Sequence, residues 1–197
     1  MLNVDTFIDT WMARMERQDP TRRGHAARSA IYALTLGQKL GLTSAQLVQL
    51  RWGMLLHDIG KVAVDDRIIR HPGTLSIDER MAVMRHPATG ADWLNDYPEL
   101  DLARTCVAFH HERWDGQGYN QGLARGAIPL FGRIAALVDA WDVMLTDRPY
   151  APAMSIGEAV AELRRCAGSQ FDPQLVDTFL VLSHRVVDIP CFVEAMI

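Results

Sequence analysis

Apolar residues recur along this chain with the period of an α-helix, in several separate segments. Near the N-terminus they follow an i, i+3, i+4, i+7 spacing, which places on one helix face Val4, Phe7, Ile8, Trp11, Met12 and Met15. A second segment of this kind ends near Gly41 and contains Ala27, Ala30, Ile31 and Leu34. A third begins at Thr43 or Ser44, both typical helix N-caps, and continues to about His57.

Caps and prolines predict where further helices begin. The segments 76–79 and 155–158 both have the sequence of a capping box. Pro87 and Pro173 suit the first turn of a helix, where no backbone N–H is needed. Signals for strands are nearly absent, and an irregular loop is expected from Glu112 to Pro129, which contains Gly116, Gly118, Gly122 and Gly126. The expected fold is therefore all-α, a single-domain helical bundle with one glycine-rich loop.

The composition of the chain excludes some functional classes but does not identify its function. The chain has 197 residues, of which 49% are hydrophobic and 22% charged, and its net charge is −4. A mildly acidic protein of this kind is not expected to bind a nucleic-acid duplex, which requires a basic face. No apolar run approaches the roughly 18 residues of a membrane span, and the N-terminus is acidic where a signal peptide would be basic. With three widely spaced cysteines, these features predict a cytoplasmic protein without a membrane span.

Histidines and carboxylates inside apolar segments indicate a metal site. His57 and Asp58 end the segment WGMLLHDIGK, His110 and His111 end another apolar segment, and Asp139 lies within IAALVDAWDVML, one turn before Asp142. Burying such groups is costly unless they are paired or share a cation. Each pair alone is more typical of a hydrogen-bonded core pair or a buried cap, but a shared cation accounts for them together.

The types of ligand narrow the choice of metal. No Cys-x-x-Cys pair is present, so a structural zinc site is not expected. Imidazole and carboxylate ligands suit iron, manganese or another first-row ion. Because adjacent helical residues point about 100° apart, we expect His110 and His111 to approach a site from different directions.

The sequence resembles the HD-GYP family, a branch of the HD-domain metal phosphohydrolases. The matching stretches are MLLHDIGKVAVDDRIIRHPGTLS, MRHPATGADWL, HHERWDGQGYNQGLARGAIPLFGRIAALVDAWDVMLTDRPY and GSQFDP. They imply an HD-type catalytic domain over residues 21–183, preceded by an amphipathic helix in residues 1–20 and followed by a tail in residues 184–197. The apolar face of the first helix is expected to pack on the chain's own core, with a homodimer surface as the alternative.

The resemblance implies a site with two divalent metal ions, iron or manganese. The implied ligands are His25, His57, Asp58, His86, His110, His111 and Asp139. Asp58 would bridge the two ions. One ion would take His25, His57 and Asp139, and the other would take His86, His110 and His111. Asp58 and Lys61 are the implied catalytic residues, and substrate phosphate is implied to contact Lys61, Arg148 and Tyr150.

Four positions depart from the family pattern, one of them Asp65, which replaces the proline that usually precedes the position of Asp66. Asn120 replaces the usual proline after Gly118-Tyr119, but asparagine tolerates turn geometry, so we still expect the loop to form. Thr21 stands where some members carry a glutamate that helps to hold a third metal, which favours two metals here. Ala151 replaces a residue that is often basic.

The implied activity is hydrolysis of cyclic di-GMP by a metal-activated hydroxide, giving the linear dinucleotide pGpG and, more slowly, GMP. The residues themselves argue only for metal-assisted hydrolysis of a phosphoester. Two alternatives are open: a hydrolase of another cyclic dinucleotide or nucleotide, and a catalytically weak receptor or scaffold that binds a cyclic dinucleotide. The loop from Gly116 to Gly122 is the implied contact for a signalling-protein partner.

Overall fold

The computed structural model of the chain describes residues 3–22, 24–147 and 152–186, except for the side chains of residues 183–186. Its α-helices are α1 (Val4–Gln18), α2 (His25–Lys39), α3 (Ser44–Leu56), α4 (Asp66–Ile69), α5 (Ile77–Met84), α6 (His86–Trp93), α7 (Asp101–Phe109), α8 (Leu130–Met144), α9 (Ile156–Cys166) and α10 (Pro173–Val186). Short 3₁₀ turns are η1 (Pro20–Arg22), η2 (Ile59–Ala63), η3 (Pro98–Leu100) and η4 (Arg125–Ala127). The described residues form no strand, which confirms the predicted all-α class.

Local sequence signals set where several helices begin. Thr43, Ser76 and Ser155 each form a capping box, at the starts of α3, α5 and α9. A proline lies in the first turn of α6, as its sequence predicts. The segment between α7 and α8 contains only the short turn η4 and otherwise irregular structure, as expected from its glycines.

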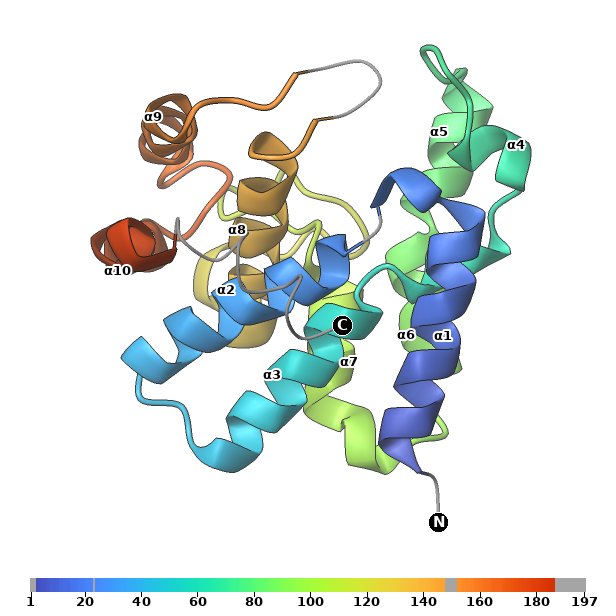
Figure 1. Cartoon of the computed structure of the whole chain (residues 1–197), viewed down its shortest axis with the longest axis horizontal. Coiled ribbons are helices and arrows are strands. Elements are labelled where there is room, and N and C mark those ends of the chain that lie inside the picture. The colour runs from blue at the N-terminus through green and yellow to red at the C-terminus, as the bar shows by residue number, and fades with distance from the viewer. Residues whose placement is uncertain (1–2, 23, 148–151, 187–197) are drawn as a thin grey trace.

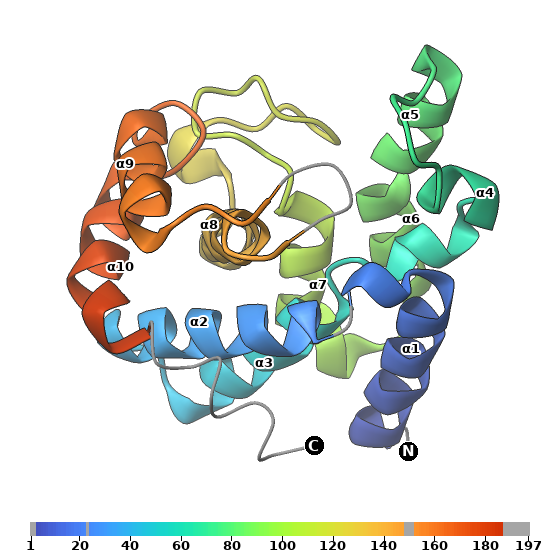
Figure 2. The ribbon, with the colours of Figure 1, turned by 45° about the horizontal axis from the view of Figure 1, so that its top comes forward.

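Helix α1 packs on the core of its own chain. Ile8 is buried, and Trp11 stacks on Trp93 with 5.2 Å between the ring centroids. The ring of Phe7 lies 4.9 Å from that of Tyr97. The apolar face predicted from the sequence is therefore covered within the chain. Figure 2 shows α1, α4, α5 and α6 on one side of the molecule.

The central bundle consists of α2, α3, α7 and α8 (Figure 1). Helices α9 and α10 lie on the side of α8 away from α1 (Figure 2), where the buried Trp141 contacts Phe179 edge to face at 5.3 Å. None of the helices in the described residues is long and apolar enough to cross a membrane. The predicted domain boundaries at residues 20 and 183 stay predictions, and most of the predicted tail lies outside the described residues.

The bundle brings the ends of several helices to one place. His25 begins α2, His57 follows the last residue of α3, His86 begins α6, and His110 follows the last residue of α7. Asp139 lies within α8, which crosses the same region. Packing is closest where η2 passes the first turn of α6, because a Cβ atom on Gly60 would lie only 2.0 Å from the carbonyl oxygen of His86.

We predict that Gly60→Ala lowers the free energy of unfolding by roughly 1–3 kcal/mol, because an added methyl group at this contact must displace the backbone of His86. The measurement is urea unfolding followed by circular dichroism. The matched control is Gly157→Ala in α9, where an added Cβ meets nothing within 4 Å. The control is expected to be neutral or slightly stabilising, because alanine favours helix. Equal stability of the two variants would contradict the close approach.

Candidate metal centre

All seven metal ligands implied by the sequence converge on one centre. Potential ligand atoms of Asp58, His86, His110 and His111 lie within 4.8 Å of one another, and so do those of His25, His57 and Asp58. Asp139 joins the second group, because its Oδ1 lies 3.0 Å from His25 Nε2 and 3.7 Å from His57 Nε2. The residues thus form two groups that share Asp58.

The carboxylate of Asp58 lies between these two groups. Its Oδ1 is 3.2 Å from Nε2 of His86 and 3.7 Å from Nε2 of His110. Its Oδ2 is 3.5 Å from Nε2 of His57. One oxygen therefore faces each group of histidines, which is the position required of a bridging carboxylate.

Three of the histidines are held in the same way. The Nδ1 atoms of His57, His86 and His110 lie 2.7, 2.7 and 3.0 Å from the carbonyl oxygens three residues earlier in the chain. A carbonyl oxygen can only accept a hydrogen bond, so each Nδ1 carries the proton. In the neutral ring the lone pair is then on Nε2, which points into the centre. A hydrogen bond that fixes the tautomer in this way is characteristic of histidines that bind metals.

His25 is held by a carboxylate instead. Its Nδ1 lies 2.6 Å from Oδ2 of the buried Asp142. Arg28 donates to both oxygens of Asp142, at 2.7 and 2.9 Å. Asp142 therefore orients His25 from behind, a role that its sequence position alone did not indicate, because its partners lie more than 100 residues away.

Several polar atoms of the centre face one another without a proton between them. Nε2 of His86 is 3.1 Å from Nε2 of His110, and both atoms carry lone pairs in the tautomers just described. Among the described residues, the buried side-chain atoms that make no hydrogen bond include His57 Nε2, Asp58 Oδ1 and Asp139 Oδ1. Leaving such an atom buried and unpaired costs about 1–3 kcal/mol. The donor set therefore fits divalent cations, which would satisfy all of these atoms.

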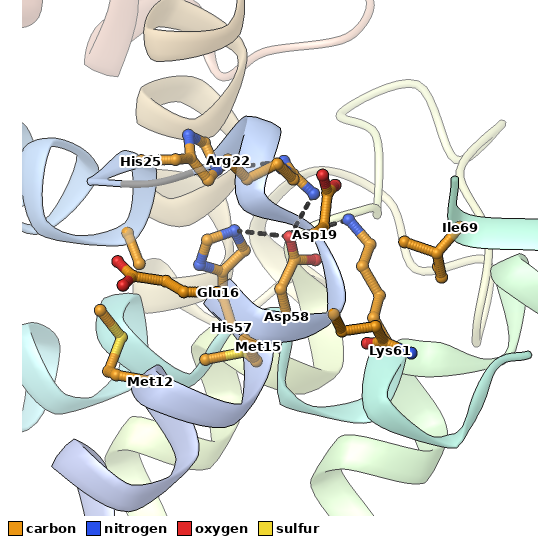
Figure 3. A pocket seen from close by; sticks show the side chains of 12 residues that line it. Met12, Met15, Glu16, Asp19, Arg22, His25, His57, Asp58, Lys61 and Ile69 are labelled. Atoms are coloured by element: carbon orange, nitrogen blue, oxygen red, sulfur yellow. Dashed lines mark hydrogen bonds and ion pairs between the residues drawn. The ribbon is translucent and has the colours of Figure 1, made fainter. Parts of the chain in front are cut away.

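Two basic side chains also contact Asp58. Lys61 Nζ and Arg22 Nη1 donate to its Oδ2, at 2.7 and 2.5 Å, and both side chains extend toward this carboxylate in Figure 3. Burial alone would raise the pKa of Asp58, but the charges of Arg22 and Lys61 outweigh it and hold the pKa well below its usual range. Lys61 is one of the residues that the resemblance implied for catalysis and for contact with substrate phosphate. The sequence analysis did not identify Arg22 as part of the centre. The one available signal was its position three residues before His25.

His110 and His111 do not approach from different directions, so that expectation is wrong. It assumed continuous helix, but α7 ends at Phe109 and the chain turns at both histidines. The two ring centroids are only 4.1 Å apart, and both rings belong to the same group. His111 also stacks on Tyr119 of the glycine-rich loop, at 4.6 Å.

The glycine-rich loop is held by a buried carboxylate that the sequence analysis missed. Glu112 is only 2% exposed and accepts hydrogen bonds from the backbone N–H groups of Gln121, Gly122 and Leu123, at 2.7, 3.1 and 3.1 Å. The one sequence feature that could have identified Glu112 is its position directly after His110 and His111.

Asn120 lets this loop form without the family's proline. Its φ angle is 105°, which the ring of a proline, fixed near about −65°, could not adopt. Its side-chain amide donates to the carbonyl oxygen of Ala108 at 2.9 Å. The expectation that asparagine is compatible with the loop is confirmed.

An open cleft of about 550 Å³ lies beside the centre. Its lining includes four basic residues, namely Arg22, Arg28, Lys61 and Arg70. A smaller pocket, shown in Figure 3, is lined by His57 and Asp58 together with Met12 and Met15 of α1. Arg148, Tyr150 and Ala151 lie outside the described residues.

Comparison with known proteins gives consistent matches. Residues 11–175 match the HD domain family. The chain is 32% identical, over 176 residues, to a Thermotoga maritima protein named cyclic di-GMP phosphodiesterase, an alignment that covers 88% of this chain and 48% of that one. It is 34% identical to a Vibrio cholerae protein named 3'3'-cGAMP-specific phosphodiesterase 2, over 81% of this chain and 31% of the other.

A solved structure of a cyclic GMP-AMP-specific phosphodiesterase from V. cholerae superposes with a TM-score of 0.69 at 22% identity, over 92% of this chain and 49% of that one. At this identity the structural likeness supports the fold alone. The chain spans about half the length, or less, of the curated relatives described here.

Removal of Glu112 should loosen the loop. We predict that Glu112→Gln lowers the free energy of unfolding by about 1–3 kcal/mol, because an amide offers one acceptor oxygen where three N–H groups were bound to a charged carboxylate. Hydrogen exchange of the amides of residues 121–123 should accelerate as well. Glu162→Gln, which changes a partly exposed pair with Arg165 and a contact from Cys166 Sγ at 3.5 Å, is the control. Similar exchange in both variants would contradict this role.

The centre should also make stability depend on pH in the absence of metal. Burial lowers the pKa of His86 to about 4 and lowers that of His110 and of His111. An unfolded histidine titrates near about 6.5, so the unfolded chain binds more protons between these values. After treatment with chelator, the free energy of unfolding should therefore fall as the pH drops from 6.5 toward 4, by up to about 1.4 kcal/mol per pH unit for each histidine.

Urea titrations at several pH values measure this dependence. His86→Gln should make it shallower, whereas His71→Gln, at an exposed position, should preserve it. Stability that stays constant or rises below pH 6.5 would show that the buried histidines do not enter the fold uncharged.

Proposed function

The chain belongs to the HD domain family, and from that premise we propose that it is a metal-dependent phosphodiesterase of a cyclic dinucleotide, with cyclic di-GMP as substrate. The observation that carries the proposal is the position of Asp58, whose two oxygens face two separate groups of histidines. The names of the relatives from T. maritima and V. cholerae support the substrate class.

We assign the two groups to two divalent ions. His25, His57 and Asp139 would hold one ion, His86, His110 and His111 would hold the other, and Asp58 would be shared by both groups. Imidazole with carboxylate favours iron or manganese. A third ion is not proposed, because the hydroxyl of Thr21 is engaged with Asp19 Oδ1 at 2.5 Å and a threonine is a poor ligand.

When bound, the two ions would lower the pKa of a water and stabilise the charge that develops on the phosphate. The chain supplies the setting for this chemistry. The Nδ1 hydrogen bonds keep the lone pairs of the histidines aimed at the centre, and Lys61 is placed to bind a non-bridging phosphate oxygen in the cleft. Hydrolysis of one of the two phosphodiester bonds opens the ring and gives the linear dinucleotide pGpG.

The cleft supports an anionic substrate of this size. Its volume lies within the range of about 300–1,000 Å³ that is typical of small-molecule sites. Although the whole protein carries a net charge of −4, the cleft is lined by four basic side chains and by only two carboxylates, Asp19 and Asp142. A local positive field of this kind attracts and orients an anion despite the overall charge.

A second substrate deserves the same test. Identity to the relative named for 3'3'-cGAMP, 34%, is close to the 32% shared with the relative named for cyclic di-GMP. Sequence similarity therefore does not separate the two cyclic dinucleotides. A receptor or scaffold without activity is disfavoured, because all seven proposed ligands are present and converge.

Asp58→Ala is expected to lose bound metal and at least about 10³-fold in activity, because the bridging ligand is gone. Asp58→Asn keeps the shape of the side chain and tests the charge alone. The assay follows cyclic di-GMP and 3'3'-cGAMP with protein reloaded with Mn²⁺ or Fe²⁺ after chelation. Metal content is measured in parallel, and circular dichroism checks the fold.

Asp96→Ala, at an exposed position, is the matched control and should keep full activity. Full activity of both Asp58 variants would exclude the proposed centre. Hydrolysis of 3'3'-cGAMP at a higher kcat/KM than cyclic di-GMP would reassign the substrate and keep the reaction.

A further inference from the structure

Arg22 occupies one half of the proposed centre. Its Nη1 lies 2.5 Å from Asp58 Oδ2, and its Nη2 lies 3.1 Å from His25 Nε2 and 3.7 Å from Asp139 Oδ1. These three atoms are also the ones that would face an ion in that half. A guanidinium and a metal ion cannot both use them, since both are cations and the space is shared.

The two halves of the centre differ in this respect. Asp58 Oδ2 receives both basic side chains, Arg22 and Lys61. In the described part of the chain, the ion pairs of Asp58 Oδ1 are with histidines alone. An ion entering the half made by His86, His110 and His111 therefore displaces no charged side chain.

From this asymmetry, and resting on the metal site of the proposed function, we propose that Arg22 is a built-in counter-ion. It competes with metal for the half made by His25, His57 and Asp139. Metal then binds first and tightly to the other half, and more weakly to this one. Arg22 thereby sets how many ions the protein holds at a given metal concentration.

The position of Arg22 allows it to leave. It is the last residue of the short turn η1, which joins α1 to α2, and its side chain is 22% exposed. It lines the cleft and also the smaller pocket that Figure 3 shows. The guanidinium can therefore rotate into the cleft without rearrangement of a helix. The repulsion between a divalent ion and the guanidinium favours that rotation once metal is bound.

A purely structural role would give a different result on substitution. If Arg22 only joined Asp58 to Asp139, then Arg22→Gln would destabilise the protein and weaken metal binding with it. As a competitor, Arg22 stabilises the metal-free protein and opposes the metal. Its removal should lower stability without metal and raise affinity for metal, two changes of opposite sign.

The test is a titration of the chelator-treated 197-residue chain with Mn²⁺, in which binding is followed by calorimetry and by the electron paramagnetic resonance of free Mn²⁺. Wild-type protein should bind one ion tightly and a second at least about tenfold more weakly. Arg22→Gln should bind the second ion at least about tenfold more tightly than wild type, the change that corresponds to one lost charge-assisted contact. Thermal unfolding should show the metal-free variant to be less stable, with the difference reduced at saturating Mn²⁺.

Arg17→Gln is the matched control, because it removes the same charge from an exposed position five residues earlier, and it should titrate like wild type. If Arg22→Gln does not fold, Arg22→Lys takes its place, because lysine retains the charge but makes fewer contacts. Arg22→Lys should bind the second Mn²⁺ ion more tightly than wild type does. Two ions bound with equal affinity by wild type and unchanged by either substitution would overturn the role of Arg22 and leave the centre standing. Absence of Mn²⁺ binding in wild type and both variants would overturn the proposed function itself.

Discussion

The burial of one carboxylate, that of Asp58, is the constraint around which the centre is organised. Asp58 is 8% exposed, and an ionised carboxylate at such a position is costly unless opposite charges or hydrogen-bond donors surround it. Arg22 and Lys61 meet one of its oxygens, and His86 and His110 face the other. These residues come from η1, η2, α6 and the end of α7, so the fold must bring four segments together to keep one carboxylate charged.

Helix ends provide both the stability and the geometry of this arrangement. The last carbonyl groups of an α-helix have no partner within the helix and need donors from elsewhere. His57 and His110 follow α3 and α7 directly, and each returns its Nδ1–H to a carbonyl oxygen three residues earlier. His86 does the same at the end of α5. One hydrogen bond thus satisfies a helix terminus and aims the opposite ring nitrogen at the centre, so orientation of the candidate ligands follows from capping.

The sequence predicted the parts of this centre that have local signals. Helical periodicity and capping boxes located the helices, and the polar groups at the ends of apolar segments identified His57, Asp58, His110 and Asp139. His25 and His86 lack such surroundings and came only from the resemblance to a family. The roles of Arg22, Asp142 and Glu112 depend on partners that folding brings close. Arg22 contacts Asp58, 36 residues away in the sequence, and Asp142 contacts His25, 117 residues away. The directions of His110 and His111 were mispredicted because α7 ends at Phe109 and does not continue through the two histidines.

Charge balance connects the stability of the fold to the proposed chemistry. Asp58, Asp139 and Asp142 are offset within the centre by Arg22, Lys61 and Arg28. Divalent ions bound to the same carboxylates would neutralise them, so part of the positive charge of these side chains would no longer be needed at the centre. Arg22 and Lys61, which both line the cleft, would then have their charges available to a phosphate. Arg28 differs from them, because its contacts with Asp142 hold His25 in place and are needed with or without metal. The same chain can therefore neutralise its own carboxylates during folding and present a cationic surface to the proposed anionic substrate afterwards.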